Sequence, residues 1–237
     1  MRPDAGARLV AHAEFPAAAL HAVSYAFLAQ AFRPPGRALL EVLVSKQNEK
    51  AWGQLAELSP SPELGILATL ARDQARVGLA DPELLGRMAQ EHASLFSNPY
   101  HVAAPPYESF YASGEGLLMR EAAAAVLGAY ERAGLVLACH WRDLPDHVVA
   151  ELEFMACLCL KEAAGAAHGR DKEVRGWALH QHRFVSQHLG RWLPSLRQRI
   201  EATHAGSFYH VVARVAEALV LSHGETLSLR VRGPRDA

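Results

Sequence analysis

The segment LPDHVVAELEFMACLCLKEAAGAAHG, residues 144–169, decides the fold. Its apolar side chains recur every three or four residues, the spacing that puts them on one face of a helix. The residues of this face are Val148, Leu152, Met155 and Cys159. We expect a helix that begins near Asp143 or Pro145, because proline is tolerated in a first helical turn, and that ends at about Gly169.

The same kind of pattern recurs on both sides of this segment. Val, Ile and Thr are sparse and nowhere alternate with polar residues over the length of a strand, so β-structure is not expected. The sequence predicts an all-α protein, a single globular bundle of about nine to eleven helices over residues 1–223, with a polar C-terminal tail over 224–237. Further helices are expected over residues 16–33, 36–58, from about 62, from about 82, and over 113–134, 171–194 and 207–223.

The composition excludes several classes of function. The formal net charge is -1 with His neutral, so the chain has no basic excess for binding nucleic acid or an anionic membrane. Residues 15–32 carry no formal charge, but polar residues and Pro16 interrupt them, which favours a core helix over a signal peptide or membrane span. The odd cysteine count, 3, fits a reducing compartment better than a disulfide framework.

No catalytic or metal-binding constellation assembles from the sequence. Among 13 histidines there is one Glu-x-x-His, Glu201 to His204, whereas a di-iron bundle needs that pair on two helices. Cys157 and Cys159 are two apart on a helix and point to different sides. Neither a phosphate-binding glycine loop nor a Gly-x-Ser-x-Gly turn occurs. We expect no catalytic residue, metal or cofactor, with a histidine-rich metal- or cofactor-binding helical enzyme as an open alternative.

Three passages, in order, carry the most specific resemblance to known proteins. The first is Leu95-Phe96 followed by PPYESFY, residues 105–111, and the second is LPDHVVAELEFM, residues 144–155. The third comprises Phe184, His188-Leu189, Trp192-Leu193-Pro194 and Phe208-Tyr209. Together they resemble the landmarks of the TorD/DmsD family of redox-enzyme maturation chaperones, which includes the nitrate-reductase assembly proteins. One departure is that the acidic run that often precedes Asp-His in the family is shortened here to Leu-Pro-Asp-His.

The resemblance implies a cytoplasmic chaperone rather than an enzyme. Its partners would be the catalytic subunit of a molybdopterin oxidoreductase and that subunit's twin-arginine signal peptide, and export would wait until the cofactor is inserted. No nucleic acid and no integral membrane segment are expected as part of this function. The chain contains no Arg-Arg pair, so it is expected to carry no such signal itself. A permanent structural subunit of the redox complex is a further alternative.

A signal peptide with a basic head and an apolar segment requires a receptor that puts acid beside apolar surface. Asp146 is expected either to cap free amides or to meet a guanidinium, with His147 and Glu151 on a common helix face. Aromatic residues of the ordered loop between residues 98 and 113 would form the apolar wall. The predicted client-binding residues are Asp146, His147, Tyr107, Phe110, Tyr111, Trp141 and Glu151.

Structural roles for the same residues stay open. Asp146 and His147 are suited to holding the helix start and the neighbouring loop, and Glu151 to a solvated face. Tyr107 and Tyr111 are suited to anchoring their own loop to the core. The family resemblance is what favours the binding interpretation.

Overall fold

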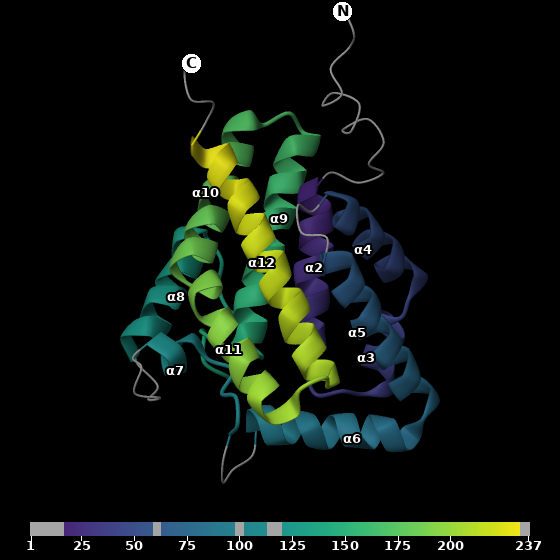
Figure 1. The fold of residues 1–237 in the computed structure, drawn as a ribbon. Helices are drawn as coiled ribbons and strands as arrows, with labels where there is room; N and C mark the ends of the chain where they lie inside the picture. The colour runs from purple at the N-terminus through teal and green to yellow at the C-terminus, as the bar shows by residue number, and fades with distance from the viewer. Residues whose placement is uncertain (1–16, 59–62, 98–101, 113–119, 233–237) are drawn as a thin grey trace, which may run out of the picture.

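Two apolar helices pack side by side through the centre of the protein (Figure 1). They are α2 (Ala17–Ala31) and α9 (Val148–Ala167), and α9 is the helix predicted from residues 144–169. Because α2 is buried on most of its sides, its uncharged sequence is that of a core helix, as predicted. The computed structural model describes residues 17–58, 63–97, 102–112 and 120–232. The predicted helix starts at Pro16, Pro62 and Ser113 lie outside these ranges.

The remaining helices surround this pair. They are α3 (Arg37–Leu43), α4 (Lys46–Leu58), α5 (Glu63–Ala80), α6 (Pro82–His92), a π-helical turn (Ala93–Ser97), α7 (Glu108–Ala112), α8 (Arg120–Arg132), α10 (Asp171–Gln187), α11 (Leu189–His204) and α12 (Phe208–Arg232). The described residues form no strand, and their one β pairing is an isolated bridge between Tyr107 and His147. The prediction of an all-α bundle is therefore confirmed.

The long helix α12 crosses in front of α2 and α9 in Figure 1. It packs against α5 on one side and against α10 and α11 on the other. α6 runs across the lower end of the bundle in this view, near the end of α2 and the start of α9. Three separate parts of the chain therefore meet at this lower end.

The helix predicted over residues 36–58 is divided into α3 and α4 by a break at Ser45. The Ser45 carbonyl accepts from the Glu49 N–H at 3.0 Å, and its hydroxyl accepts from the Asn48 N–H at 3.4 Å. The Asn48 side chain donates to the Val42 carbonyl at 2.6 Å. These local side-chain bonds compete with a continuous helix, which is why apolar periodicity alone did not reveal the break.

The helix predicted over residues 171–194 ends early, and a second helix follows that we did not predict. α10 ends at Gln187, His188 leaves the helical region with φ -125° and ψ -99°, and α11 continues past Pro194. Gly190 is required at this break, because a Cβ there would lie 2.6 Å from the Val185 carbonyl oxygen. The proline that we took as the end of a helix lies inside one.

The polar tail predicted from residue 224 is wrong as far as Arg232, because α12 continues to that residue. Gly224 does not end the helix: a Cβ there would lie 2.9 Å from Val185 Cγ1, so the glycine permits close packing against α10. Leu227 is fully buried, and Arg230 forms an ion pair with Glu162 of α9. Packing on the bundle thus extends a helix beyond a residue type that commonly ends helices.

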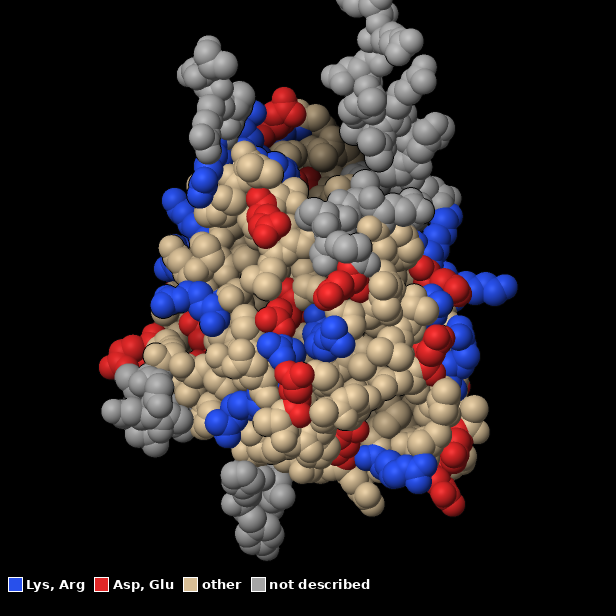
Figure 2. Space-filling model, in the orientation of Figure 1, with Lys and Arg blue, Asp and Glu red and all other residues tan. Residues whose placement is uncertain are grey.

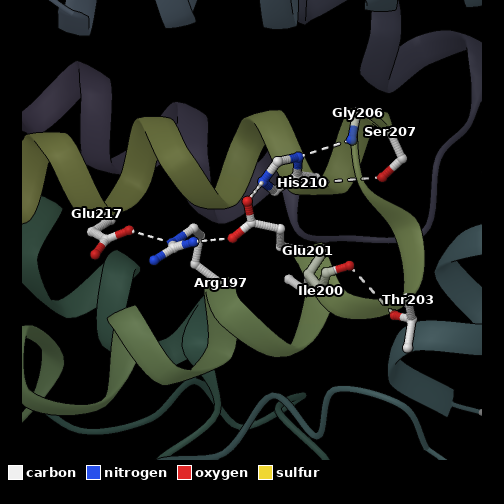
Figure 3. Close-up of polar contacts among 8 residues, drawn as sticks. All are labelled: Arg197, Ile200, Glu201, Thr203, Gly206, Ser207, His210 and Glu217. Atoms are coloured by element: carbon white, nitrogen blue, oxygen red, sulfur yellow. Dashed lines mark hydrogen bonds and ion pairs between the residues drawn. The ribbon is translucent and has the colours of Figure 1, made fainter.

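Polar contacts hold the hairpin of α11 and α12 together (Figure 3). Arg197 of α11 lies between Glu201 of the same helix and Glu217 of α12, and its Nε donates to Glu217 at 2.7 Å. In the turn, Gly206 adopts a φ of 78°, and its N–H donates to His210 Nδ1 at 2.9 Å. Glycine suits this turn because it adopts positive φ without steric cost.

The face of the protein in Figure 2 mixes acidic and basic side chains. No extended basic patch is visible on it, so this face offers no surface for charge-driven binding to a polyanion. Within the described ranges, no helix has both the length and the apolar character that crossing a bilayer requires.

Candidate functional site

Two segments far apart in the sequence are joined at the start of α9. Tyr107 and His147 form the isolated antiparallel bridge. The Val148 N–H donates to the Pro106 carbonyl at 2.8 Å. On the other side of the bridge, the Glu108 N–H donates to the Asp146 carbonyl at 3.0 Å. The segment before α7 is thereby fixed to the first turn of α9. The loop predicted between residues 98 and 113 is wrong at residues 108–112, which form helix α7.

His147 is the N-cap of α9. Its Nδ1 accepts from the Val149 N–H at 3.1 Å, so a neutral ring carries its proton on Nε2. Burial lowers the pKa of His147 to about 4, although two nearby aspartates act in the opposite direction. The ring is therefore neutral at pH 7, and the rings of Tyr107 and Trp141 lie edge-on to it with centroids at 5.2 and 5.8 Å.

Asp146 faces the interior and is 0% exposed. Its Oδ2 accepts from the Ser109 N–H at 2.8 Å, at the beginning of α7. The carboxylate therefore satisfies a free amide of α7, whereas the sequence indicated such a role only at the start of its own helix. Its other oxygen, Oδ1, is buried without a hydrogen-bond partner. In this arrangement Asp146 cannot contact a client.

Glu151 is also 0% exposed and belongs to a buried polar cluster behind the bridge. It accepts from Trp192 Nε1 at 3.1 Å, while the neighbouring Glu108 lies 3.0 Å from His188 Nδ1. Complete burial, reinforced by the charge of Glu108, raises the pKa of Glu151 well above its usual range. The cluster connects α7, α9 and α11 in the interior, so the solvated face considered for Glu151 is wrong.

A recess of about 720 Å³ opens beside the bridge, within the size range of small ligand-binding clefts. Its walls come from the end of α2, the end of α6 with the following π-helical turn, residues 106–107, residues 137–143 and the first turns of α9. Of the predicted site residues, Tyr107, Trp141 and His147 line this recess. Its apolar lining includes Phe32, Phe96, Pro106, Leu137, Val148 and Val149.

The other two aromatic residues predicted for the wall do not line the recess. The ring of Tyr111 stacks on that of Trp192, with centroids 5.5 Å apart. The Arg199 guanidinium lies over the ring of Phe110 at 5.1 Å. Both contacts are with α11, so Phe110 and Tyr111 attach α7 to that helix instead of facing the recess.

The carboxylates that line the recess are Asp143 and Glu153, and neither was predicted as a site residue. Asp143 accepts from the Tyr107 hydroxyl at 3.0 Å. Burial raises the pKa of Tyr107, and the charge of Asp143 and this hydrogen bond raise it further. Glu153 accepts from the Arg33 guanidinium at 2.7 Å. The recess therefore has acidic and apolar parts, as predicted, but a different pair of acids supplies the charge.

Helical geometry contained a signal for Glu153. Val149 and Glu153 are four residues apart on α9, so they share one helix face, and both line the recess. Glu151 lies between them in sequence and therefore points elsewhere, into the interior. The deciding information is which face of α9 is covered, and that depends on how α7 and α11 pack.

The histidines beside the recess do not form a metal centre. Across the described parts of the chain, no group of three or more His, Cys, Asp or Glu side chains could hold a metal ion. Cys159 is buried and Cys157 exposed, as expected for residues two apart on a helix.

The described chain is an all-α bundle with a mixed acidic and apolar recess. A crystal structure of a protein from Archaeoglobus fulgidus, described as a "putative redox enzyme maturation protein", has the same fold. The two superimpose with a TM-score of 0.50 over 84% of this chain and 93% of that chain, at 20% sequence identity. This chain therefore shares the all-α fold of that protein.

The family follows from the sequence comparison. The family model described as "Nitrate reductase delta subunit" matches residues 44–198, more than half of the chain. The chain belongs to this family, which is the TorD/DmsD family that the three passages of the sequence resemble.

Curated relatives match shorter stretches. The chlorate reductase assembly chaperone of Ideonella dechloratans is 52% identical over 62 residues, 26% of this chain and 31% of that protein. The perchlorate reductase assembly chaperone of Dechloromonas aromatica is 32% identical over 100 residues, 42% of this chain and 44% of that protein. The chaperone TorD of Vibrio cholerae is 29% identical over 133 residues, 56% of this chain and 59% of that protein. This chain thus spans about a third to three fifths of the length of these relatives.

Proposed function

We propose that this protein is a cytoplasmic assembly chaperone for the catalytic subunit of a molybdopterin oxidoreductase. In this proposal the recess binds the subunit's twin-arginine signal peptide, and the chaperone itself catalyses no reaction. Binding would delay export until the cofactor has been inserted. Family membership and the names of the curated relatives support the chaperone role.

The observation that carries the proposal is the chemistry of the recess. Tyr107 and Trp141 offer large aromatic surfaces, which suit the apolar segment of a signal peptide. Asp143 and Glu153 line the same recess and suit its arginine pair, because guanidinium groups form charge-assisted hydrogen bonds with carboxylates. His147 is neutral and adds no positive charge that would oppose the peptide.

A synthetic peptide tests the proposal directly. The probe is a labelled peptide with an Arg-Arg head and a leucine- and alanine-rich segment, and its binding is followed by fluorescence anisotropy. We expect a Kd on the order of micromolar, typical of transient recognition. Trp141→Ala should weaken binding about tenfold, because tryptophans that become buried on binding often contribute most of the binding energy of an interface.

Trp177 of α10 provides the matched control. It is also half-buried but lies outside the recess, so Trp177→Ala should leave the Kd unchanged. Equal effects of the two substitutions, or no binding by the wild type, would contradict the proposal.

The description of the family as a subunit favours one second candidate, a permanent component of the mature reductase. Purification of the mature enzyme from cells that express a tagged copy of this chain separates the two functions. A chaperone is found with the apo catalytic subunit and is absent from the finished enzyme, whereas a structural subunit is present in both.

A further inference from the structure

An ion pair crosses the recess. One nitrogen of the Arg33 guanidinium donates to Glu153 Oε1 at 2.7 Å, and both residues line the cavity. Their side chains are 39% and 41% exposed, so solvent and an incoming group can reach both. Arg33 follows the end of α2, and Glu153 lies on α9, so the pair connects two elements that form the base of the site.

The main chain at Arg33 is held in place independently of this pair. The Tyr209 hydroxyl donates to the Arg33 carbonyl at 3.2 Å, and the Arg33 N–H donates to the Gln30 carbonyl at 3.0 Å. The side chain can therefore leave Glu153 without disturbing the end of α2.

The guanidinium of Arg33 is incompletely satisfied. Its Nε is buried and has no hydrogen-bond partner, and its hydrogen bond to Glu153 uses one nitrogen instead of the two that a bidentate pair uses. Such a half-exposed, singly bonded pair is weak compared with a bidentate arginine–carboxylate pair. Glu153 thus already binds a guanidinium in the recess, but it does so in a form that a better-placed guanidinium can replace.

We propose that Arg33 stands in for an arginine of the client, and that Glu153 is the carboxylate which determines the requirement for a guanidinium. Binding is then an exchange in which a client arginine displaces Arg33 from Glu153 and Arg33 turns to solvent. The resident arginine keeps the carboxylate paired while the recess is empty and sets a threshold that weak cationic ligands do not pass. This inference rests on the proposed function, since it assumes that the recess receives a basic peptide.

The test compares Arg33→Gln and Glu153→Gln in the anisotropy assay with the Arg-Arg peptide. Because an exposed pair contributes little, Arg33→Gln should tighten binding about two- to fivefold. Glu153→Gln should weaken it about tenfold, through loss of a charge-assisted hydrogen bond. A peptide with a Gln-Gln head should bind the wild type weakly and gain nothing from Arg33→Gln.

Arg142 is the matched control for general electrostatics. It is exposed and lines the same recess, so removing its charge also lowers the repulsion of a basic peptide. In the exchange mechanism, Arg142→Gln produces a clearly smaller gain than Arg33→Gln. An equal gain would mean that repulsion alone operates, and it would overturn the inference.

The outcomes for the two proposals are distinguishable. A wild type that does not bind the Arg-Arg peptide overturns the proposed function. A wild type that binds, while neither folded Arg33 variant binds more tightly than the wild type, overturns only the exchange. Arg33→Met, which retains the aliphatic stem, serves as a second variant, and thermal unfolding of each protein shows whether the fold is kept. A tighter complex with either folded Arg33 variant supports the exchange.

Discussion

Replacement of Asp146 by alanine should destabilise the protein. The carboxylate is fully buried, and its one hydrogen bond, 2.8 Å long, satisfies the Ser109 N–H at the start of α7. Alanine leaves that buried amide without a partner and removes the cap of α7. A hydrogen bond to a charged group contributes about 1.5–3 kcal/mol. Because Asp146 Oδ1 has no partner, removing the charge also relieves a desolvation cost, so we expect a loss of about 2 kcal/mol.

The loss is measured by urea unfolding followed by far-UV circular dichroism. For a chain of this length, about 2 kcal/mol corresponds to a fall in Tm of roughly 4–8 °C. Asp146→Asn keeps an acceptor oxygen for the Ser109 amide and should lose less than half as much. Asp143→Ala, at an exposed acid of the same turn, should cost less, about 0.5–1 kcal/mol, because its hydrogen bond from Tyr107 is exposed to solvent.

The refuting result is specific. If Asp146→Ala kept the wild-type urea midpoint and weakened binding of the Arg-Arg peptide, the carboxylate would be an accessible contact. The binding role that sequence analysis assigned to Asp146 would then be restored, and the buried cap would be rejected.

Three further predictions follow from packing and burial. Leu227→Ala should cost about 2–4 kcal/mol in urea unfolding because Leu227 is 0% exposed, whereas Leu229→Ala, at a residue 74% exposed, should be nearly neutral. Gly190→Ala should lower the stability by about 1–3 kcal/mol, since its Cβ would meet a carbonyl oxygen at 2.6 Å. Gly176→Ala, with open space around it, should raise the stability by about 0.5–1 kcal/mol. The pKa of His147 is about 6.5 in the unfolded chain and about 4 in the folded protein, so stability should fall as the pH drops from about 6.5 towards 4. His147→Asn should flatten this dependence in urea midpoints measured across that pH range.

Much of the helical architecture was predictable from local chemistry. Asp81 caps α6 in the predicted way, its side chain accepting from the Glu83 N–H at 2.9 Å, and Gly134 adopts the positive φ expected after α8. The errors occurred where tertiary contacts override a local signal. Gly190 and Gly224 are glycines because α10 approaches them closely, and no local pattern distinguishes that need from a helix end.

The candidate site was predictable in its location and only partly in its residues. Tyr107 and His147 come together because the segments before α7 and α9 pair through their main chains, so both residues line one recess. Asp146 and Glu151 were attractive as acids beside a helix start, but their burial depends on α7 and α11, which lie far away in sequence. Glu153 is accessible for the opposite reason, since its face of α9 is left open beside the end of α2.

The bridge between Tyr107 and His147 has a consequence for how related chaperones diverge. One wall of the recess belongs to loops clamped by main-chain hydrogen bonds, whose formation does not depend on side-chain identity at the clamp. Substitutions at Tyr107 or Trp141 can therefore reshape the cavity while the α2–α9 core stays intact. The lining of the recess can therefore change in evolution on one scaffold, with little effect on the stability of the fold.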